Sequence, residues 1–174
     1  MQVRFKQMLA VLVLVIAEFA VTAVVAAAGQ TAKAALQSVV ATARKWQSDA
    51  VLVSLSTVKA DSDGTSDEWK YSFYSPASKK RFVATARGMK VDGREVRLGF
   101  STEAMGDFVD SDRAMQEAKK NGLKGHEPSM AVKFQGAGKG AAFYWVVNGG
   151  YSKGDVSIFL DAKSAKFANR AVVE

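Results

Sequence analysis

Calcium binding is the metal chemistry that the residue types suggest most strongly, in the acidic stretch 61–68, which reads DSDGTSDE. Oxygen-bearing side chains at alternate positions around a glycine are the ligands that Ca²⁺ prefers. The full EF-hand loop, which ends in a bidentate glutamate, is not present. An exposed Asp-Gly turn between two strands requires the same residue types. We therefore predict a polar turn and no metal site, and we keep calcium binding between Asp61 and Asp67 as an alternative.

General-base chemistry would depend on His126, the only histidine in the sequence. A catalytic or metal-bound histidine needs an orienting partner or further ligands. The surrounding residues Gly125, Glu127 and Pro128 offer little of either. A Ser–His–Asp triad is also disfavoured, because the sequence contains no Gly-x-Ser-x-Gly motif. We expect His126 to be a solvated loop residue, and we predict that the protein is not an enzyme and has no catalytic residues.

The glycine-rich stretch 136–140 (GAGKG) shares only its composition with a phosphate-binding loop. A Walker loop reads Gly-x-x-x-x-Gly-Lys-Ser/Thr and connects a strand to a helix. Here the apolar alternation on both sides predicts strands instead. The stretch is therefore interpreted as a hairpin loop, and no cofactor is expected.

Two rows of aromatic residues could in principle stack nucleic-acid bases. Trp69, Tyr71 and Phe73 form one row, and Phe143 and Trp145 form the other. Aromatic residues at every second position more often form the buried face of a sheet. We expect internal packing and no nucleic acid as partner.

The composition is that of a globular protein without covalent staples. Of its 174 residues, 48% are apolar and 24% are charged, and cysteine is absent. The absence of cysteine excludes disulfides, thiolate nucleophiles and cysteine-based zinc or iron–sulfur sites. A chain of this length can bury a core by itself.

Residues 1–28 have the layout of a secretory signal peptide. Arg4 and Lys6 precede a long apolar segment, and Ala26-Ala27-Ala28 supplies small residues at the expected cleavage position. Alternatively, residues 7–28 are retained as a membrane anchor, because the apolar segment is long enough to cross a bilayer. Glu18 would then lie within the membrane and require a partner.

Both alternatives place the remaining chain outside the cytoplasm. A cleaved signal predicts a periplasmic or secreted protein, whereas a retained anchor predicts attachment to the inner membrane with the body in the periplasm. The formal charge is +7, and it becomes +6 without residues 1–28, which contain two basic residues and one acidic residue. We interpret most of this excess as scattered solubilising lysines, with acidic partners as the alternative.

The remaining sequence predicts two helices and several strands. A helix is expected over 31–48 and another over 113–121, since apolar residues recur there at helical spacing. Period-two alternation predicts strands at 51–56, 69–74, 80–86, 130–134, 142–148 and 156–160. A tight turn at Asp92-Gly93 is expected to lead into a further strand at 95–100.

The two halves follow the same order of elements: helix, strand, turn, aromatic strand, turn and strand. Such internal repetition predicts two small units. The predicted fold class is α+β: two repeats of one helix packed on an antiparallel β-sheet, after an N-terminal hydrophobic helix. The predicted domains are 1–28 (signal peptide or anchor), 29–105 and 106–174. We expect the units to pack together or to join edges into one longer sheet.

The second half resembles a PepSY-type domain. The resemblance rests on Ala114-x-x-x-Ala118 with Gly122, and on the ending from Val156 to Lys166 that contains Asp161-Ala162. The family's ending is typically Asp-Ala-x-Thr-Gly-Lys, whereas this sequence has Ala165 in place of the glycine. The first half is a more divergent match. The resemblance implies an exported, non-enzymatic domain of the kind found in protease propeptides and small periplasmic proteins, which binds or inhibits other proteins.

The predicted function is therefore an exported PepSY-like module that binds or inhibits another protein, such as a protease or an envelope complex. Contact is expected through sheet edges and through the turns at 61–67, 136–140 and 149–154. Tyr74, Tyr144 and Tyr151 are the aromatic residues expected to be exposed for such contact. The alternative is an accessory subunit of a cell-envelope complex, anchored in the membrane through residues 7–28.

Overall fold

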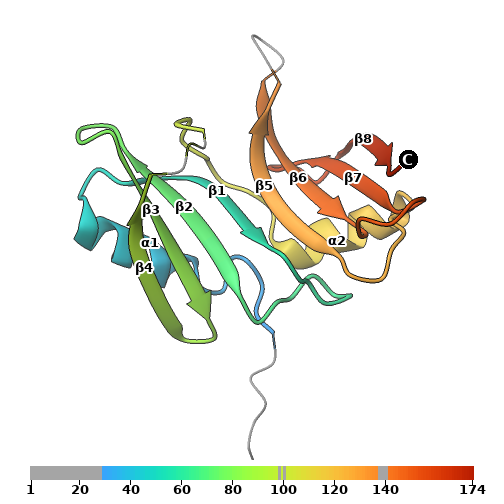
Figure 1. Ribbon diagram of the computed structural model, residues 1–174, viewed down its shortest axis with the longest axis horizontal. Helices are drawn as coiled ribbons and strands as arrows, with labels where there is room; N and C mark the ends of the chain where they lie inside the picture. The colour runs from blue at the N-terminus through green and yellow to red at the C-terminus, as the bar shows by residue number, and fades with distance from the viewer. Residues whose placement is uncertain (1–28, 98, 100, 137–140) are drawn as a thin grey trace, which may run out of the picture.

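The computed structural model describes residues 29–97, 99, 101–136 and 141–174. Within these residues, the strands belong to one antiparallel sheet with the order β4-β3-β2-β1-β5-β6-β7-β8 (Figure 1). The elements in chain order are α1 (Leu36–Trp46), β1 (Val51–Thr57), β2 (Trp69–Ser75), β3 (Lys80–Arg87), β4 (Lys90–Val96), α2 (Ser111–Lys120), β5 (Ser129–Gln135), β6 (Ala142–Asn148), β7 (Val156–Asp161) and β8 (Phe167–Val172).

The predicted fold class, two repeats that each pack a helix on an antiparallel sheet, is wrong. The described chain is mostly a continuous eight-stranded sheet with two short helices. β1 pairs with β5 through Leu55–Val132, Ser56–Ala131 and Thr57–Met130, so the sheet is not divided. The physical reason is that both strands would otherwise expose an unpaired edge of N–H and C=O groups. Hydrophobic alternation predicts the faces of a strand but does not predict which edges pair.

The predicted N-terminal hydrophobic helix lies outside the described residues, as do the predicted signal peptide at 1–28 and the alternative anchor at 7–28. Among the helices that the structure describes, none has the length and apolar character needed to span a membrane. Neither α1, with 11 residues, nor α2, with 10, approaches the roughly 20 residues that a span requires.

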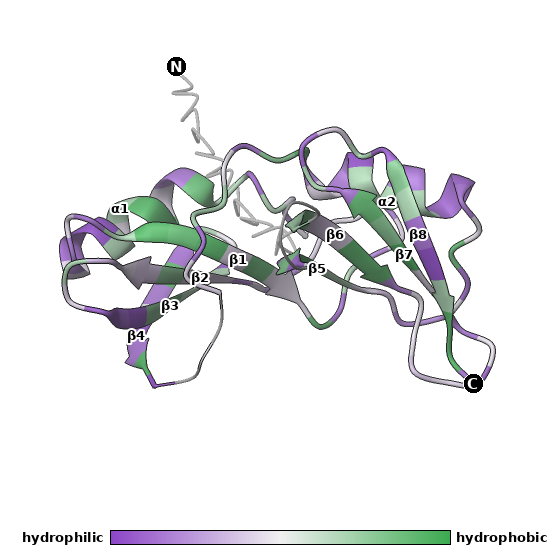
Figure 2. Cartoon of the chain, turned by 90° about the horizontal axis from the view of Figure 1, so that it is seen from above, coloured by the Kyte–Doolittle hydropathy of each residue, from purple (hydrophilic) through white to green (hydrophobic). Residues whose placement is uncertain are grey.

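Both helices cover the same face of the sheet (Figure 2). α1 packs on β3 and β4, and α2 packs on β6 and β7. The core between helices and sheet contains Trp69, Tyr71, Phe73 and Trp145, each at most 1% exposed. The prediction that these aromatic residues are used for internal packing is confirmed. The opposite face of the sheet carries no helix in the described part of the chain.

The polar atoms of the buried aromatic residues are satisfied by the segments that lead into the two helices. Trp69 Nε1 donates to the Gln30 carbonyl at 2.8 Å, and the Tyr71 hydroxyl donates to the Ala32 carbonyl at 2.7 Å. Trp145 Nε1 donates to the Val109 carbonyl at 3.0 Å. Because a buried donor without a partner is costly, these bonds hold the segments before α1 and α2 against the sheet.

The predicted turn at Asp92-Gly93 is wrong, because both residues lie inside β4. The chain reverses earlier, between Arg87 and Lys90, where Gly88 has φ 56°. Gly93 has another function: a Cβ atom there would lie 2.1 Å from Cζ of Phe82. The glycine therefore makes room for a ring that stacks on Trp46, with centroids 5.0 Å apart. Gly93 is therefore required for packing against Phe82 and does not mark a turn.

Candidate protein-interaction site

The acidic stretch 61–68 folds as a turn whose side chains bind its own backbone. Asp63 Oδ1 accepts from the Thr65 hydroxyl at 2.7 Å and from the Thr65 N–H at 3.0 Å, and these bonds lower the pKa of Asp63. Gly64, with φ 89°, packs against the backbone of Ser111 at the start of α2. No group of three or more acidic or histidine side chains suited to a metal ion occurs among the described residues. The predicted polar turn is confirmed, and calcium binding stays an untested alternative.

The sequence-predicted surface residues do not converge on one site. His126 is an exposed loop residue, as predicted, and lines a cavity of about 290 Å³ with Met115 and Leu123. Tyr151 is 80% exposed, whereas Tyr74 and Tyr144 are half-buried. Of the predicted glycine-rich loop, residues 137–140 lie outside the described residues. The antiparallel pairing of β5 with β6 confirms that this loop connects two strands.

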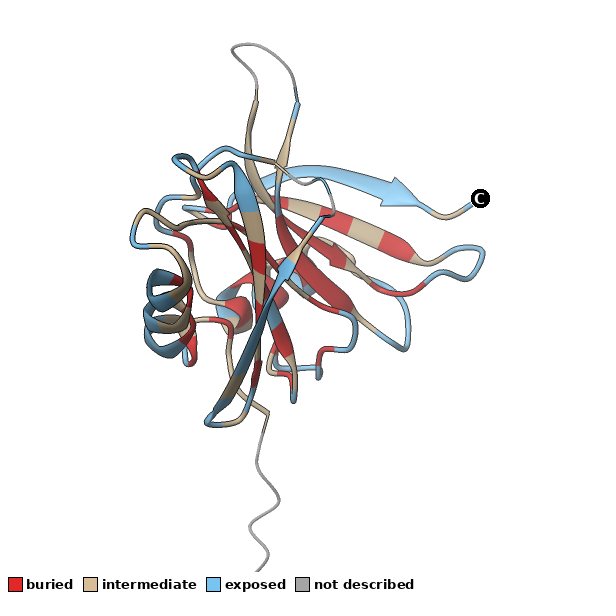
Figure 3. Cartoon of the chain, turned by 60° about the vertical axis from the view of Figure 1, so that its left-hand side comes forward, coloured by how far each residue is buried: buried red, intermediate tan, exposed pale blue. Residues whose placement is uncertain are grey.

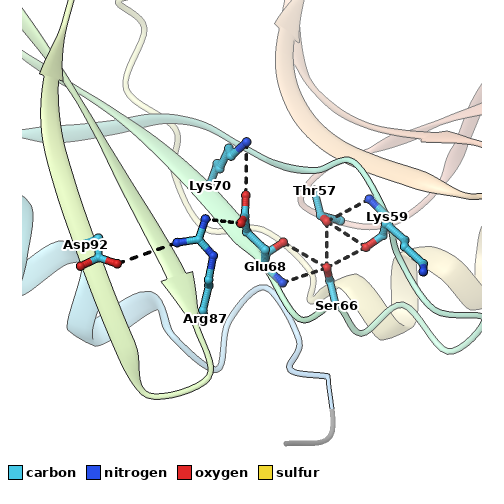
Figure 4. Close-up of polar contacts among 7 residues, drawn as sticks. All are labelled: Thr57, Lys59, Ser66, Glu68, Lys70, Arg87 and Asp92. Carbon is cyan, nitrogen blue, oxygen red and sulfur yellow. Dashed lines mark hydrogen bonds and ion pairs between the residues drawn. The ribbon is translucent and has the colours of Figure 1, made fainter.

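The free edge at β4 is covered with charges. β4 carries Lys90, Asp92 and Glu95, which form ion pairs with each other or with β3: Lys90–Asp92 at 3.3 Å and Lys80–Glu95 at 3.2 Å. Arg87 reaches both Asp92 and Glu68, which also accepts from Lys70 (Figure 4). Charged side chains on an edge strand oppose pairing with another chain. The β4 edge is thus protected, although each exposed ion pair contributes little stability.

Glu68 is the residue that joins this charged edge to a second polar cluster. Partial burial tends to raise the pKa of Glu68, but hydrogen bonds from Lys70 and Arg87 outweigh it and hold the pKa below its usual value. The backbone of Glu68 contacts the hydroxyl of Ser66, which also contacts Thr57 at 2.8 Å (Figure 4). This arrangement stabilises the chain entering β2, and it offers no group that is free for chemistry.

The opposite edge, β8, is exposed along its whole length. Each of its six residues is exposed, including Phe167 at 50% and Val172 at 51% (Figure 3). α2 packs mainly on β6 and β7, so β8 lies beyond the cover of the helix. The strand contains no proline, no glycine and one charged residue, Arg170. Apart from a register shift in its pairing with β7 between Phe167 and Asn169, it lacks the proline and the several charged side chains that usually protect an edge strand.

The backbone N–H and C=O groups of β8 point alternately toward β7 and toward the free edge of the sheet. The N–H of Val173 donates to Asp155 and its carbonyl accepts from Gly154, so Val173 faces β7. Val156, which lies opposite Val172, directs its own N–H and C=O away from β8. Because orientation alternates along an antiparallel strand, Val172 and Arg170 present their backbone groups at the free edge. The N–H of Arg170 donates to Asn169 Oδ1 at 2.8 Å, as expected for an outward-facing group.

A cavity lies beside β8 on the face that the helices do not cover. It has a volume of about 390 Å³, and its walls include Tyr144, Phe159 and Asn169. Phe159 pairs with Asn169 across β7 and β8. The exposed edge and this aromatic-walled cavity form one continuous candidate surface, which we call the β8 surface: β8 together with Tyr144 and Phe159.

Sequence reasoning missed β8 altogether. Its sequence, FANRAV, has two polar residues in the centre and two alanines, so it shows no apolar alternation. The preceding turn contains Ala165 in the left-handed region, with φ 59°. Asp161 closes that turn by accepting from the hydroxyl of Ser164 at 2.6 Å. The turn forms with Ala165 in the position where the PepSY-type ending has glycine.

No protein-family model matches this sequence, and no curated protein matches it. The fold is similar to the crystal structure of a putative lipoprotein from Clostridium difficile 630, with a TM-score of 0.50 and 11% sequence identity. The match covers 78% of this chain and 91% of the other. At this identity the similarity shows the fold alone. The PepSY resemblance stays a prediction.

Proposed function

We propose that this protein is an exported, non-enzymatic binding module that receives an extended segment of another protein along β8. The observation that carries the proposal is the exposure of every residue of β8, an edge strand with outward-facing backbone groups at Arg170 and Val172. An added strand gains main-chain hydrogen bonds, and its side chains fit alternate positions of the edge. No catalytic group is required for this activity.

The contrast between the two edges of the sheet favours β8 over β4. An incoming strand at β4 would have to displace ion pairs that involve Asp92 and Glu95. At β8 it would instead cover Phe167 and Val172, which are half exposed. Burying the exposed halves of these two side chains would contribute roughly 1–3 kcal/mol in total. The contribution adds to the hydrogen bonds that the strand forms.

Two observations support the exported location. Residues 1–28 have the composition of a secretory signal, and the structurally similar protein is described as a putative lipoprotein. The PepSY resemblance adds a protease as one class of partner and inhibition as one consequence of binding. An accessory subunit anchored through residues 7–28 is the alternative form of the same export hypothesis.

The proposal is tested by photo-crosslinking in cells, with a photoreactive residue placed at Arg170 in β8 or, as the matched control, at Arg94 in β4. We expect a protein adduct from position 170 and none from position 94. Val172→Pro removes an outward-facing N–H group and should abolish the adduct, whereas Val172→Ala should retain it. Equal adducts at both positions, or none at position 170, would contradict the proposal.

A further inference from the structure

The side chains of β8 on the helix side of the sheet form a row that is apolar, basic and apolar. Phe167, Arg170 and Val172 lie opposite Leu160, Ile158 and Val156, respectively. These three partners are at most 1% exposed, so they point into the core beneath α2. Opposed residues of paired strands point to the same face. Arg170 therefore lies on this face between two exposed apolar side chains, two residues from Val172 and, across a register shift of the pairing, three from Phe167.

Arg170 has no carboxylate partner within the chain as far as the structure describes it. The ion pairs of the described residues do not include it. Its Nη1 atom lies 3.7 Å from the position that a Cβ atom on Gly122 would occupy, just after the end of α2. Glu117, the acidic residue nearest to that end of α2, is bound to Lys120 at 2.7 Å. The guanidinium lies on the helix side of β8, beside the end of α2, and is thus available to a group from another molecule.

We propose that the segment received by β8 carries an acidic residue opposite Arg170 and, two positions away, an apolar residue opposite Val172. This inference rests on the proposed function and specifies its partner: an extended segment in which one residue separates the acidic from the apolar position. Side chains of a strand repeat every two residues on one face, so these two positions meet Arg170 and Val172, whereas Phe167 lies three residues from Arg170 because β8 shifts register between them. The intervening residue faces the other side, near Asn169 and the aromatic-walled cavity, and is not specified.

The charge of Arg170 explains why the residue opposite it in the incoming segment should be acidic. A carboxylate opposite the guanidinium forms charge-assisted hydrogen bonds, which are stronger than neutral ones. A basic residue there would place like charges directly opposite each other, which destabilises strand pairing. The same argument disfavours a second copy of this chain in the register that centres on Arg170, because two arginines would then be opposed. The formal charge of +7 also favours approach of an acidic partner.

The experiment measures binding of labelled synthetic peptides to the full chain by fluorescence anisotropy. The peptides SVTETVS and SVTKTVS differ only in the central residue, and SVTQTVS is the neutral reference. We expect the glutamate peptide to bind about tenfold more tightly than the lysine peptide. Arg170→Glu should reverse that order, and Arg170→Gln should remove the difference. Val172→Pro should abolish binding of every peptide.

The outcomes separate this inference from the proposed function. Equal binding of the glutamate and lysine peptides, abolished by Val172→Pro, would overturn the acidic-partner inference and leave strand addition in place. Absence of peptide binding would overturn the inference, and the crosslink at position 170 in cells would then decide the proposed function separately. A dimer in sedimentation that Val172→Pro dissociates would identify a second copy as the occupant and would also overturn the inference.

Discussion

The indole rings of Trp69 and Trp145 meet edge to face, with centroids 6.2 Å apart and an interplanar angle of 78°. The two residues lie 76 positions apart in the sequence, on β2 and β6, and neither is exposed to solvent. Phe108 extends the contact, with its ring centroid 6.1 Å from that of Trp145. The core is therefore shared across the β1–β5 junction, and the two sides of the sheet should unfold together.

Replacement of both tryptophans should reveal direct coupling between the two sides of the sheet. We expect Trp69→Leu and Trp145→Leu each to lower the free energy of unfolding by about 3 kcal/mol or more. The double variant should lose less than the sum by about 0.5–1.5 kcal/mol, because the aromatic pair can be lost only once. Urea denaturation measures all four proteins. Strict additivity would show that the pair contributes nothing beyond separate burial.

Removal of one hydroxyl should loosen the segment that precedes α1. Tyr71→Phe leaves the buried Ala32 carbonyl without the bond that now measures 2.7 Å. We expect a loss of about 1–2 kcal/mol in urea denaturation. Tyr151→Phe is the matched control, because Tyr151 is 80% exposed and should change stability by less than about 0.5 kcal/mol. An equal effect of the two substitutions would contradict the role assigned to the Tyr71 hydroxyl.

Proline substitution at adjacent positions of β8 should distinguish the outward and inward backbone groups. Ala171→Pro removes an N–H that faces Ser157 on β7, so we expect a loss of about 3 kcal/mol. Val172→Pro removes an outward N–H and should cost less than about 1 kcal/mol. Thermal and urea denaturation provide the comparison. The reverse order of effects would mean that the edge of β8 is oriented the other way.

Acid should weaken the turn that precedes β8 through protonation of Asp161. Hydrogen bonds from Ser164 hold the pKa of Asp161 below its usual value, and they outweigh the opposing effect of partial burial. A lowered folded-state pKa means that the stabilisation is present above the unfolded pKa of about 4 and is lost as the pH falls through the folded value.

The free energy of unfolding that is lost when Asp161 is protonated is small, because Asp161 is only partly buried. We expect it to be no more than about 1 kcal/mol, since solvent screens a partly exposed carboxylate. Asp161→Asn should remove this part of the pH dependence between about pH 5 and pH 2 in urea denaturation. Hydrogen exchange of β8 amides should report the same loss locally. An unchanged pH profile in Asp161→Asn would contradict the assignment.

A methyl group at Gly93 should disturb the first side of the sheet. Gly93→Ala places Cβ against the ring of Phe82, 2.1 Å from Cζ, so the ring must move and its stacking on Trp46 must change. We expect a loss of about 1–3 kcal/mol. Gly88→Ala is not an equivalent control, because Gly88 has a positive φ. The double variant Gly93→Ala/Phe82→Leu should recover part of the loss, and failure to recover would argue against the clash.

The sequence by itself predicted the features that depend on local periodicity. Alternation around Trp69 and Trp145 predicted strands with a buried aromatic face, and apolar residues at helical spacing predicted a helix over 113–121, because solvent exposure repeats with the period of each element. Gly93 was misassigned, since a glycine at a strand position and a glycine in a turn look alike without the ring of Phe82 beside it.

The tertiary structure alone decided how the strands are ordered and which edge remains open. Pairing of β1 with β5 depends on edge-to-edge complementarity between residues such as Leu55 and Val132, which no local pattern encodes. β8 carries no period-two signal, and it forms because β7 offers an unpaired edge next to the turn at Asp161. The exposure of Phe167 and Val172 follows from where α2 ends its cover of the sheet, and that is a property of packing rather than of sequence.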